Sequence, residues 1–140
     1  MRIRGTTSSR NLPIVEFELA GFSSFFKSVN ACVDTGFEGE LLLMDKNLEP
    51  FFDANCGSYE LGIVRGLFDE SVRAKLYTVK VVCDGSQKGA VIAVPQTYKT
   101  VDIKTEGQIL IGGAFLSEFS VNVDYPKICD NTLLWRTKIL

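Results

Sequence analysis

The sequence predicts an all-β fold, a small β-barrel or closed sheet with one short helix late in the chain. Apolar and polar residues alternate with a period of two along most of the chain, and glycine-bearing turns separate these short segments. The size agrees, because 140 residues with 46% hydrophobic and 23% charged side chains suit one globular domain spanning 1–140.

The first half of the chain supplies three predicted strands. Residues 15–19 and 29–33 alternate between apolar and polar side chains, which is typical of strands with one buried face. Residues 40–44 are almost wholly apolar, as in a strand covered on both faces. After them, Asp45 could cap a short helix before Pro50, or the phenylalanines that follow could anchor a loop. The sequence leaves both open.

The second half of the chain predicts a long hairpin and further short elements. Its two strands are residues 59–63 and 72–76, which alternate on either side of a glycine- and charge-bearing stretch. The other predicted elements are a strand over 90–94 that Pro95 ends, an apolar strand over 108–111, one or two helical turns over 114–119, an alternating strand over 121–125 and an apolar terminal strand over 132–135.

Composition excludes several kinds of chemistry. The chain has no histidine, which removes the Ser-His-Asp and Cys-His mechanisms and histidine-ligated metal centres. Its four cysteines form no CxxC pair, and we expect no metal and no cofactor. Their even number would permit two disulfides, but the absence of a secretory signal favours free thiols. With a net charge of −2 and no basic cluster, nucleic acid is not an expected partner. No segment predicts a membrane span or a signal peptide, so we expect a cytoplasmic protein without a membrane partner.

The most informative segment is Asp34-Thr35-Gly36, which follows the apolar end of the predicted strand over 29–33. Such a strand delivers the carboxyl group of Asp34 to a tight turn, where Thr35 can supply a hydroxyl hydrogen bond. Gly36 permits a close backbone approach. An ordinary turn at a strand end also favours Asp and Gly for local reasons, so the tripeptide alone does not decide between the two interpretations.

A second segment resolves this in favour of a family resemblance. Ile111-Gly112 ends an apolar strand before the predicted late helix, and the order of the two segments resembles that of the retropepsin-like aspartic proteases, especially their small prokaryotic relatives. The resemblance implies a closed barrel of the acid protease fold, with a flap hairpin and one short late helix. It also implies an aspartic endopeptidase.

The chain holds one such aspartate, whereas the chemistry needs two carboxyl groups, one to take a proton from water and one to donate a proton to the carbonyl oxygen. The resemblance therefore implies a homodimer with Asp34 from each subunit, acting on a peptide or protein substrate. Thr35 and Gly36 would support the active-site loop, and Ile111 with Gly112 would form the second glycine turn.

The remaining roles also come from the resemblance. Phe37 stands where the family has a small residue and would narrow the cleft. The hairpin would be the flap, with Gly62 and Gly66 near its tip beside the substrate. Residues 1–12 would form an N-terminal arm, and the tail over 126–140 would supply a dimer strand, although Trp135 and its neighbours could instead pack on their own barrel.

Two other functions stay open on the sequence. The first is a retropepsin-like module that lacks catalysis and binds peptide or dimerises, because a fold does not fix a function. The second is a β-barrel that binds an apolar small molecule.

Overall fold

Ten strands form the framework of the protein in the computed structural model, which describes residues 1–7, 12–22, 25–34, 37–65, 71–97, 107–122 and 131–135. The strands are β1 (Arg2–Thr7), β2 (Pro13–Ala20), β3 (Phe26–Val33), β4 (Leu41–Leu43), β5 (Glu60–Arg65), β6 (Ser71–Cys83), β7 (Ser86–Pro95), β8 (Ile109–Ile111), β9 (Phe119–Asn122) and β10 (Asn131–Trp135). The helical elements are the short 3₁₀ helix η1 (Lys46–Leu48), α1 (Glu49–Asn55) and α2 (Gly113–Leu116).

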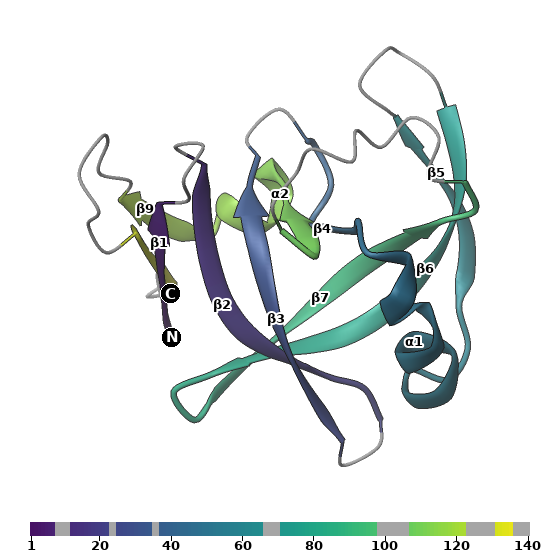
Figure 1. The fold of residues 1–140 in the computed structure, drawn as a ribbon, viewed down its shortest axis with the longest axis horizontal. Helices are drawn as coiled ribbons and strands as arrows, with labels where there is room; N and C mark the ends of the chain where they lie inside the picture. Colours follow the sequence, from purple (N-terminus) through teal and green to yellow (C-terminus); the bar gives the residue numbers. More distant parts are fainter. Residues whose placement is uncertain are drawn as a thin grey trace, which may run out of the picture.

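Six strands close into a barrel (Figure 1). Their order is β6-β7-β4-β8-β3-β2, and β2 pairs with β6 through Leu19 opposite Val81 to complete the ring. β3 runs parallel to β8 and β4 runs parallel to β7, whereas β4 and β8 are antiparallel. The predicted all-β barrel is therefore confirmed at the level of its architecture.

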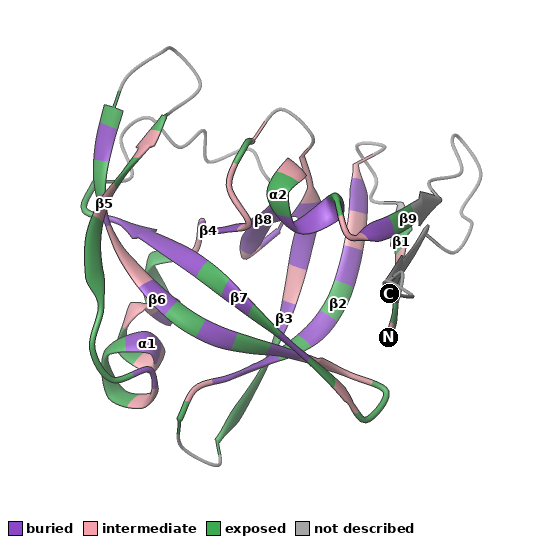
Figure 2. Ribbon diagram, turned by 180° about the vertical axis from the view of Figure 1, so that it is seen from behind, coloured by how far each residue is buried: buried purple, intermediate pink, exposed green. Residues whose placement is uncertain are grey.

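Alternating burial explains why the longer strands lie where they do. On β2, Val15, Phe17 and Leu19 are buried in the core while Glu16 and Glu18 are exposed, which is the predicted period-two pattern (Figure 2). β4 and β8 are instead buried along their whole length, because strands of the sheet cover both of their edges and other elements cover both faces.

The helices differ in detail from the sequence prediction. The late helix is present, but α2 ends at Leu116, and the chain is already in β9 from Phe119. An earlier helix, α1, begins at Glu49 with Pro50 in its first turn, and its Phe52 is buried in the core. Asp45 caps η1 rather than α1, its side chain accepting a hydrogen bond from the Asn47 amide at 3.0 Å.

Both ends of the chain add strands outside the barrel. β1, within the predicted N-terminal arm, pairs with β2 on one side and with β10 on the other. β10 pairs with β9 along its second edge, so both edges of Asn131–Trp135 are occupied within one chain. Along these residues, a strand from a second subunit would have to replace β1 or β9. The remainder of the predicted dimer strand lies outside the described residues.

Candidate active site

Strand β3 carries Asp34 to one end of the barrel. Ala31 and Cys32 are buried, and β3 lies parallel to β8 with Val33 opposite Ile111. The backbone amide of Asp34 donates to the Ile111 carbonyl at 2.9 Å, which extends this pairing one residue beyond the strand. Asp34 is half-buried there, directly beside the turn that Gly112 begins. The structure thus brings together Asp34 and the Ile111-Gly112 turn, two segments far apart in the sequence.

The turn at Gly112 packs directly against the loop that follows Asp34. The Gly112 amide donates to the Glu40 carbonyl at 2.8 Å, and the Gly113 amide donates to the Phe37 carbonyl at 2.6 Å. A Cβ atom on Gly112 would lie 2.1 Å from the Gly39 carbonyl oxygen and 2.4 Å from the Phe37 ring. Glycine is therefore required at 112 by close approach of two chain segments.

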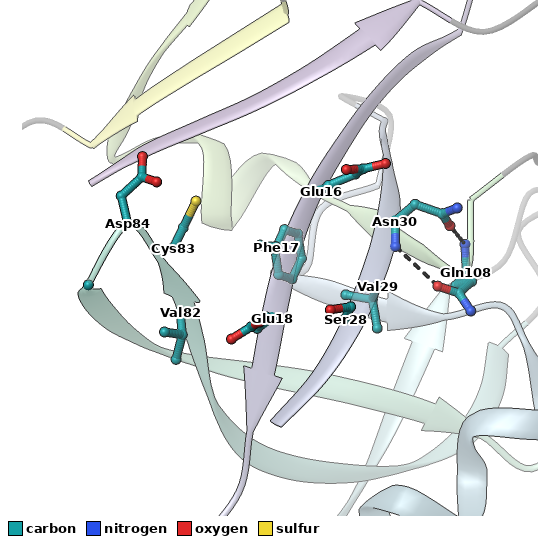
Figure 3. A pocket seen from close by; sticks show the side chains of 11 residues that line it. Glu16, Phe17, Glu18, Ser28, Val29, Asn30, Val82, Cys83, Asp84 and Gln108 are labelled. Carbon is teal, nitrogen blue, oxygen red and sulfur yellow. Dashed lines mark hydrogen bonds between the residues drawn. The ribbon is translucent and has the colours of Figure 1, made fainter. Parts of the chain in front are cut away.

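A pair of polar side chains locks β3 to β8 at the other end of their contact. The backbone amide of Asn30 donates to Gln108 Oε1 at 3.1 Å. The backbone amide of Gln108 donates to Asn30 Oδ1 and to the backbone carbonyl of Asn30, each at 3.0 Å. Figure 3 shows the two side chains facing each other across the strands. The sequence analysis did not single out either residue, because a reciprocal pair 78 positions apart leaves no local signal.

A cavity of about 530 Å³ opens between the loop after Asp34 and the β5–β6 hairpin. Its described lining comes from three parts of the chain: Phe37, Glu38, Gly39, Glu40 and Leu41 from the loop and β4; Ile63, Val64, Arg65 and Leu76 from the hairpin; and Val91 and Ala93 from β7. Most of these side chains are apolar, which suits an extended peptide with apolar side chains. Phe37 is the first of these residues, three positions after Asp34.

Charged groups lie at the edges of this cleft. Glu40 accepts a hydrogen bond from the Val91 amide at 2.6 Å, so its carboxylate fastens the loop to β7. Glu38 and Arg65 are exposed at the two sides, one from the loop and one from the hairpin. A peptide entering the cleft would therefore pass one acidic and one basic side chain.

The predicted substrate-binding residues are placed unevenly. Phe37 lines the cleft, and its predicted role in substrate binding stays a prediction. Gly62 is not among the lining residues, and a Cβ atom there would lie 2.5 Å from Cδ1 of Leu76, which does line it. Gly66, Thr35 and Gly36 lie outside the described residues, so their predicted roles stay predictions.

A second hollow of about 520 Å³ lies on the outer face of β2 and β3 (Figure 3). The carboxylates of Glu16, Glu18 and Asp84 border it, together with Cys83, whose thiol contacts the Arg2 carbonyl at 3.2 Å. Burial and the nearby Asp84 raise the pKa of Cys83, which disfavours a reactive thiolate. Within the described part of the chain, no group of three or more cysteine and carboxylate side chains is placed to hold a metal ion.

Cysteine chemistry is also disfavoured beside the candidate active site. Cys32 is a buried free thiol on β3, and Cys56 and Cys83 are free as well, whereas Cys129 lies outside the described residues. Burial raises the pKa of Cys56 to about 11. These thiols therefore act as packing groups in the core.

No protein-family model matches this chain, and no curated protein matches its sequence. The resemblance to retropepsin-like proteases consequently rests on the chain's own residues.

Proposed function

We propose that this protein is an aspartic endopeptidase that works as a homodimer and hydrolyses peptide bonds through the paired carboxyl groups of Asp34. The observation that carries the proposal is the placement of Asp34 at the end of β3, hydrogen-bonded through its backbone to Ile111 and adjacent to the turn at Gly112. The lining of the cleft begins at Phe37, three residues further along the chain, and Asp34 itself is not among the lining residues. The proposed retropepsin-like fold places the two subunits so that their Asp34 loops meet on a two-fold axis.

The proposed chemistry follows from two carboxyl groups that share one proton. The charged carboxylate takes a proton from a water molecule as the water oxygen attacks the carbonyl carbon, and the neutral carboxyl donates its proton to the carbonyl oxygen. The tetrahedral intermediate then collapses, the C–N bond breaks, and the amine leaves with a proton from the dyad. No metal or cofactor takes part in this scheme.

The cleft supports an extended peptide as the substrate. Phe37, Leu41, Val64 and Leu76 present apolar surface to it, and the β5–β6 hairpin lies where a lid over the peptide is expected. The lid would exclude water other than the attacking molecule and so strengthen the electrostatic stabilisation of the transition state.

The test is the substitution Asp34→Asn, assayed against a library of extended peptides by mass spectrometry. An amide cannot exchange a proton as the dyad must, so we expect cleavage to fall by at least about a thousandfold while the fold and the oligomeric mass are retained. Asp84→Asn is the matched control, because Asp84 lies on the exposed β6–β7 turn, has a φ of 50° that asparagine tolerates, and should keep full activity. Full activity in Asp34→Asn would remove the proposal.

One observation favours a second candidate function. The Phe37 ring fills the space above both Gly39 and Gly112, where the family has a small residue. A protein that binds peptides in this cleft without cutting them is the resulting alternative. It predicts that labelled peptides bind the wild type and Asp34→Asn equally, with no cleavage by either.

A further inference from the structure

The turn between β2 and β3 presents aromatic side chains to solvent. Phe22, Phe25 and Phe26 are 78%, 69% and 53% exposed, and we call these three residues the aromatic tip. Folded proteins seldom leave several large apolar side chains together at the surface unless they contact a partner or a membrane. The aromatic tip therefore calls for an explanation that the barrel core does not supply.

The backbone of the aromatic tip is braced by the end of α1. The Phe22 amide donates to the Asn55 carbonyl at 2.8 Å, and a Cβ atom on Gly21 would lie only 2.0 Å from that same carbonyl oxygen. The Phe22 ring also comes near Gly57, whose φ of +68° lets the chain turn sharply there. Phe22 is thus held in place at the surface before any partner binds, which lowers the entropy cost of docking.

Two lysines lie at the base of the tip, Lys80 on the same face of the sheet as Phe26 and Lys27 on the opposite face. Phe26 on β3 is opposite Ala20 on β2, and Ala20 is in turn opposite Lys80 on β6, so Phe26 and Lys80 share one face of the sheet. Lys27 follows Phe26 directly, and both lysines are exposed without an ion pair to any described residue. Glu18, one step further along the same face as Ala20, is the acidic side chain nearest to them on β2.

We propose that the aromatic tip docks the protein onto a bilayer surface that contains anionic lipids. Aromatic side chains are favoured at the boundary between headgroups and acyl chains, and lysines beside them attract anionic headgroups. A projecting hairpin tip suits a soft, flat surface. The described part of the chain contains no helix long and apolar enough to cross a membrane, but docking of this kind needs none. The expectation of no membrane partner was based only on such segments.

Strand β3 fixes the distance between this tip and the candidate active site. Phe26 begins the strand and Val33 ends it next to Asp34. The eight residues of β3 therefore put the aromatic tip about 25 Å from Asp34. In Figure 1 the end of β2 and the start of β3 lie at the foot of the barrel, and β3 ends at the opposite side. Docking would leave the cleft facing away from the lipid. The proposal does not depend on peptidase activity.

The experiment is co-sedimentation of the full chain with vesicles of phosphatidylcholine and phosphatidylserine, and with vesicles of phosphatidylcholine alone. We expect binding to the mixed vesicles that weakens with added salt, and several-fold weaker binding to phosphatidylcholine. The double variant Phe22→Ser/Phe25→Ser should lower binding by roughly tenfold to a hundredfold, because two apolar side chains no longer enter the lipid. Lys27→Glu/Lys80→Glu should remove the preference for phosphatidylserine.

Leu61→Ser is the matched control, because Leu61 is 74% exposed on β5, away from the tip, and its loss should leave vesicle binding unchanged. A second readout uses Phe25→Trp, whose fluorescence should shift to the blue on mixed vesicles relative to wild type, which carries only Trp135. Absence of binding to either vesicle, or equal binding by the Phe22→Ser/Phe25→Ser variant, overturns the proposal. The proposal is also overturned if the mass of the wild-type protein in solution rises with its concentration while the mass of the Phe22→Ser/Phe25→Ser variant stays that of a monomer. The aromatic tip would then bind a second copy of the chain rather than a lipid surface.

Discussion

Phe37 and Gly112 constrain each other at the candidate active site. The Phe37 ring lies where Cβ atoms on Gly39 and Gly112 would be, at 2.6 Å and 2.4 Å from ring atoms. A bulky side chain at 37 is therefore compatible with the loop only because two glycines leave room for it. The Phe37 ring is therefore accommodated within the loop and the turn at Gly112.

This close packing predicts that Gly112→Ala strongly lowers the free energy of unfolding. The added methyl group would meet the Gly39 carbonyl oxygen at 2.1 Å, which is backbone and cannot turn away. We expect a loss of about 2–4 kcal/mol in the free energy of unfolding, measured by urea denaturation. Gly89→Ala is the control, because nothing lies within 4 Å of a Cβ atom there, and its change should stay within about 0.5 kcal/mol. Equal effects of the two substitutions would contradict the close approach at Gly112.

The buried thiol of Cys56 predicts how stability depends on pH in the alkaline range. Burial raises the pKa of Cys56 from 9.0 to about 11, so between these values the unfolded chain loses a proton that the folded chain keeps. The contribution of the protonated Cys56 thiol to the free energy of unfolding is fully present below pH 9. It is lost as the pH rises through 11, and the loss is roughly 1–2 kcal/mol. Urea unfolding of Cys56→Ala should show a shallower decline than the wild type over this range.

Tyr77 and Cys83, whose pKa values are also raised by burial, remain in both proteins and contribute to both slopes. Because the Cys56 thiolate is one of the charges that raise the pKa of Tyr77, the difference between the two slopes measures Cys56 together with its coupling to Tyr77. For Tyr77, a hydrogen bond donated to Asp53 at 2.5 Å adds to the shift, because it is lost on ionisation. Parallel slopes for wild type and Cys56→Ala would show that the thiol ionises equally in both states.

At the scale of elements, the pairing of β3 with β8 decides where Asp34 lies. Asn30 and Gln108 hold one end of this parallel pair, and the Asp34–Ile111 hydrogen bond holds the other. Parallel strands need long connections, so nothing local in either segment fixes their register. The Asn30–Gln108 contacts therefore help to set the height of Asp34 above the barrel.

A double-mutant cycle with Asn30→Ala and Gln108→Ala tests this contact. Gln108→Ala removes the side-chain acceptor of the Asn30 backbone amide and should lower the free energy of unfolding by about 1–2 kcal/mol. Asn30→Ala should cost less, about 0.5–1 kcal/mol, because the Gln108 backbone amide still donates to the Asn30 carbonyl. The double variant should cost less than the sum, with a coupling of about 1 kcal/mol. Gln87→Ala, on the exposed β6–β7 end, should be nearly neutral. Strict additivity would mean that the two side chains do not act together.

At the scale of the whole molecule, nine of the ten described strands build a barrel and a terminal sheet that share β2, and β5 pairs with β6 outside the barrel. The barrel closes through β2 and β6, and β10 lies between β1 and β9 in the terminal sheet. The chain supplies one Asp34, so the proposed activity requires assembly that a single barrel cannot provide. Oligomerisation and activity should then be linked by mass action.

This linkage predicts that cleavage per milligram of protein rises with protein concentration and levels off once dimers dominate. The measurement is peptide cleavage across a dilution series, with mass from light scattering at the same concentrations. Mixing wild type with an excess of Asp34→Asn should reduce activity beyond simple dilution, because mixed dimers hold one competent carboxyl. Mixing with Asp84→Asn is the control and should not. Constant specific activity in a monomeric protein would contradict the shared site.

The sequence by itself determined the local features of this protein. The alternation of apolar and polar residues predicted β2, β3 and the hairpin strands, and continuous apolar runs predicted β4 and β8. A strand buried on one face alternates in hydrophobicity, whereas a strand buried on both faces is apolar throughout. The sequence also singled out Asp34, Phe37 and Gly112. Each of these signals is contained in a few consecutive residues of the chain.

Only the tertiary structure decided what these segments do together. It showed that Asp45 caps the short helix η1 before Pro50 and that the phenylalanines after Pro50 are in the helix α1 rather than in a loop. It also paired β10 with β1 and β9, and joined Asn30 to Gln108. It also left Phe22 and its neighbours on the surface, although their apolar character alone would place them inside. The hydrophobic period of a segment indicates which faces of that one strand are buried. Which strands pair, and which apolar side chains stay exposed, depends on contacts between residues that are distant in the sequence.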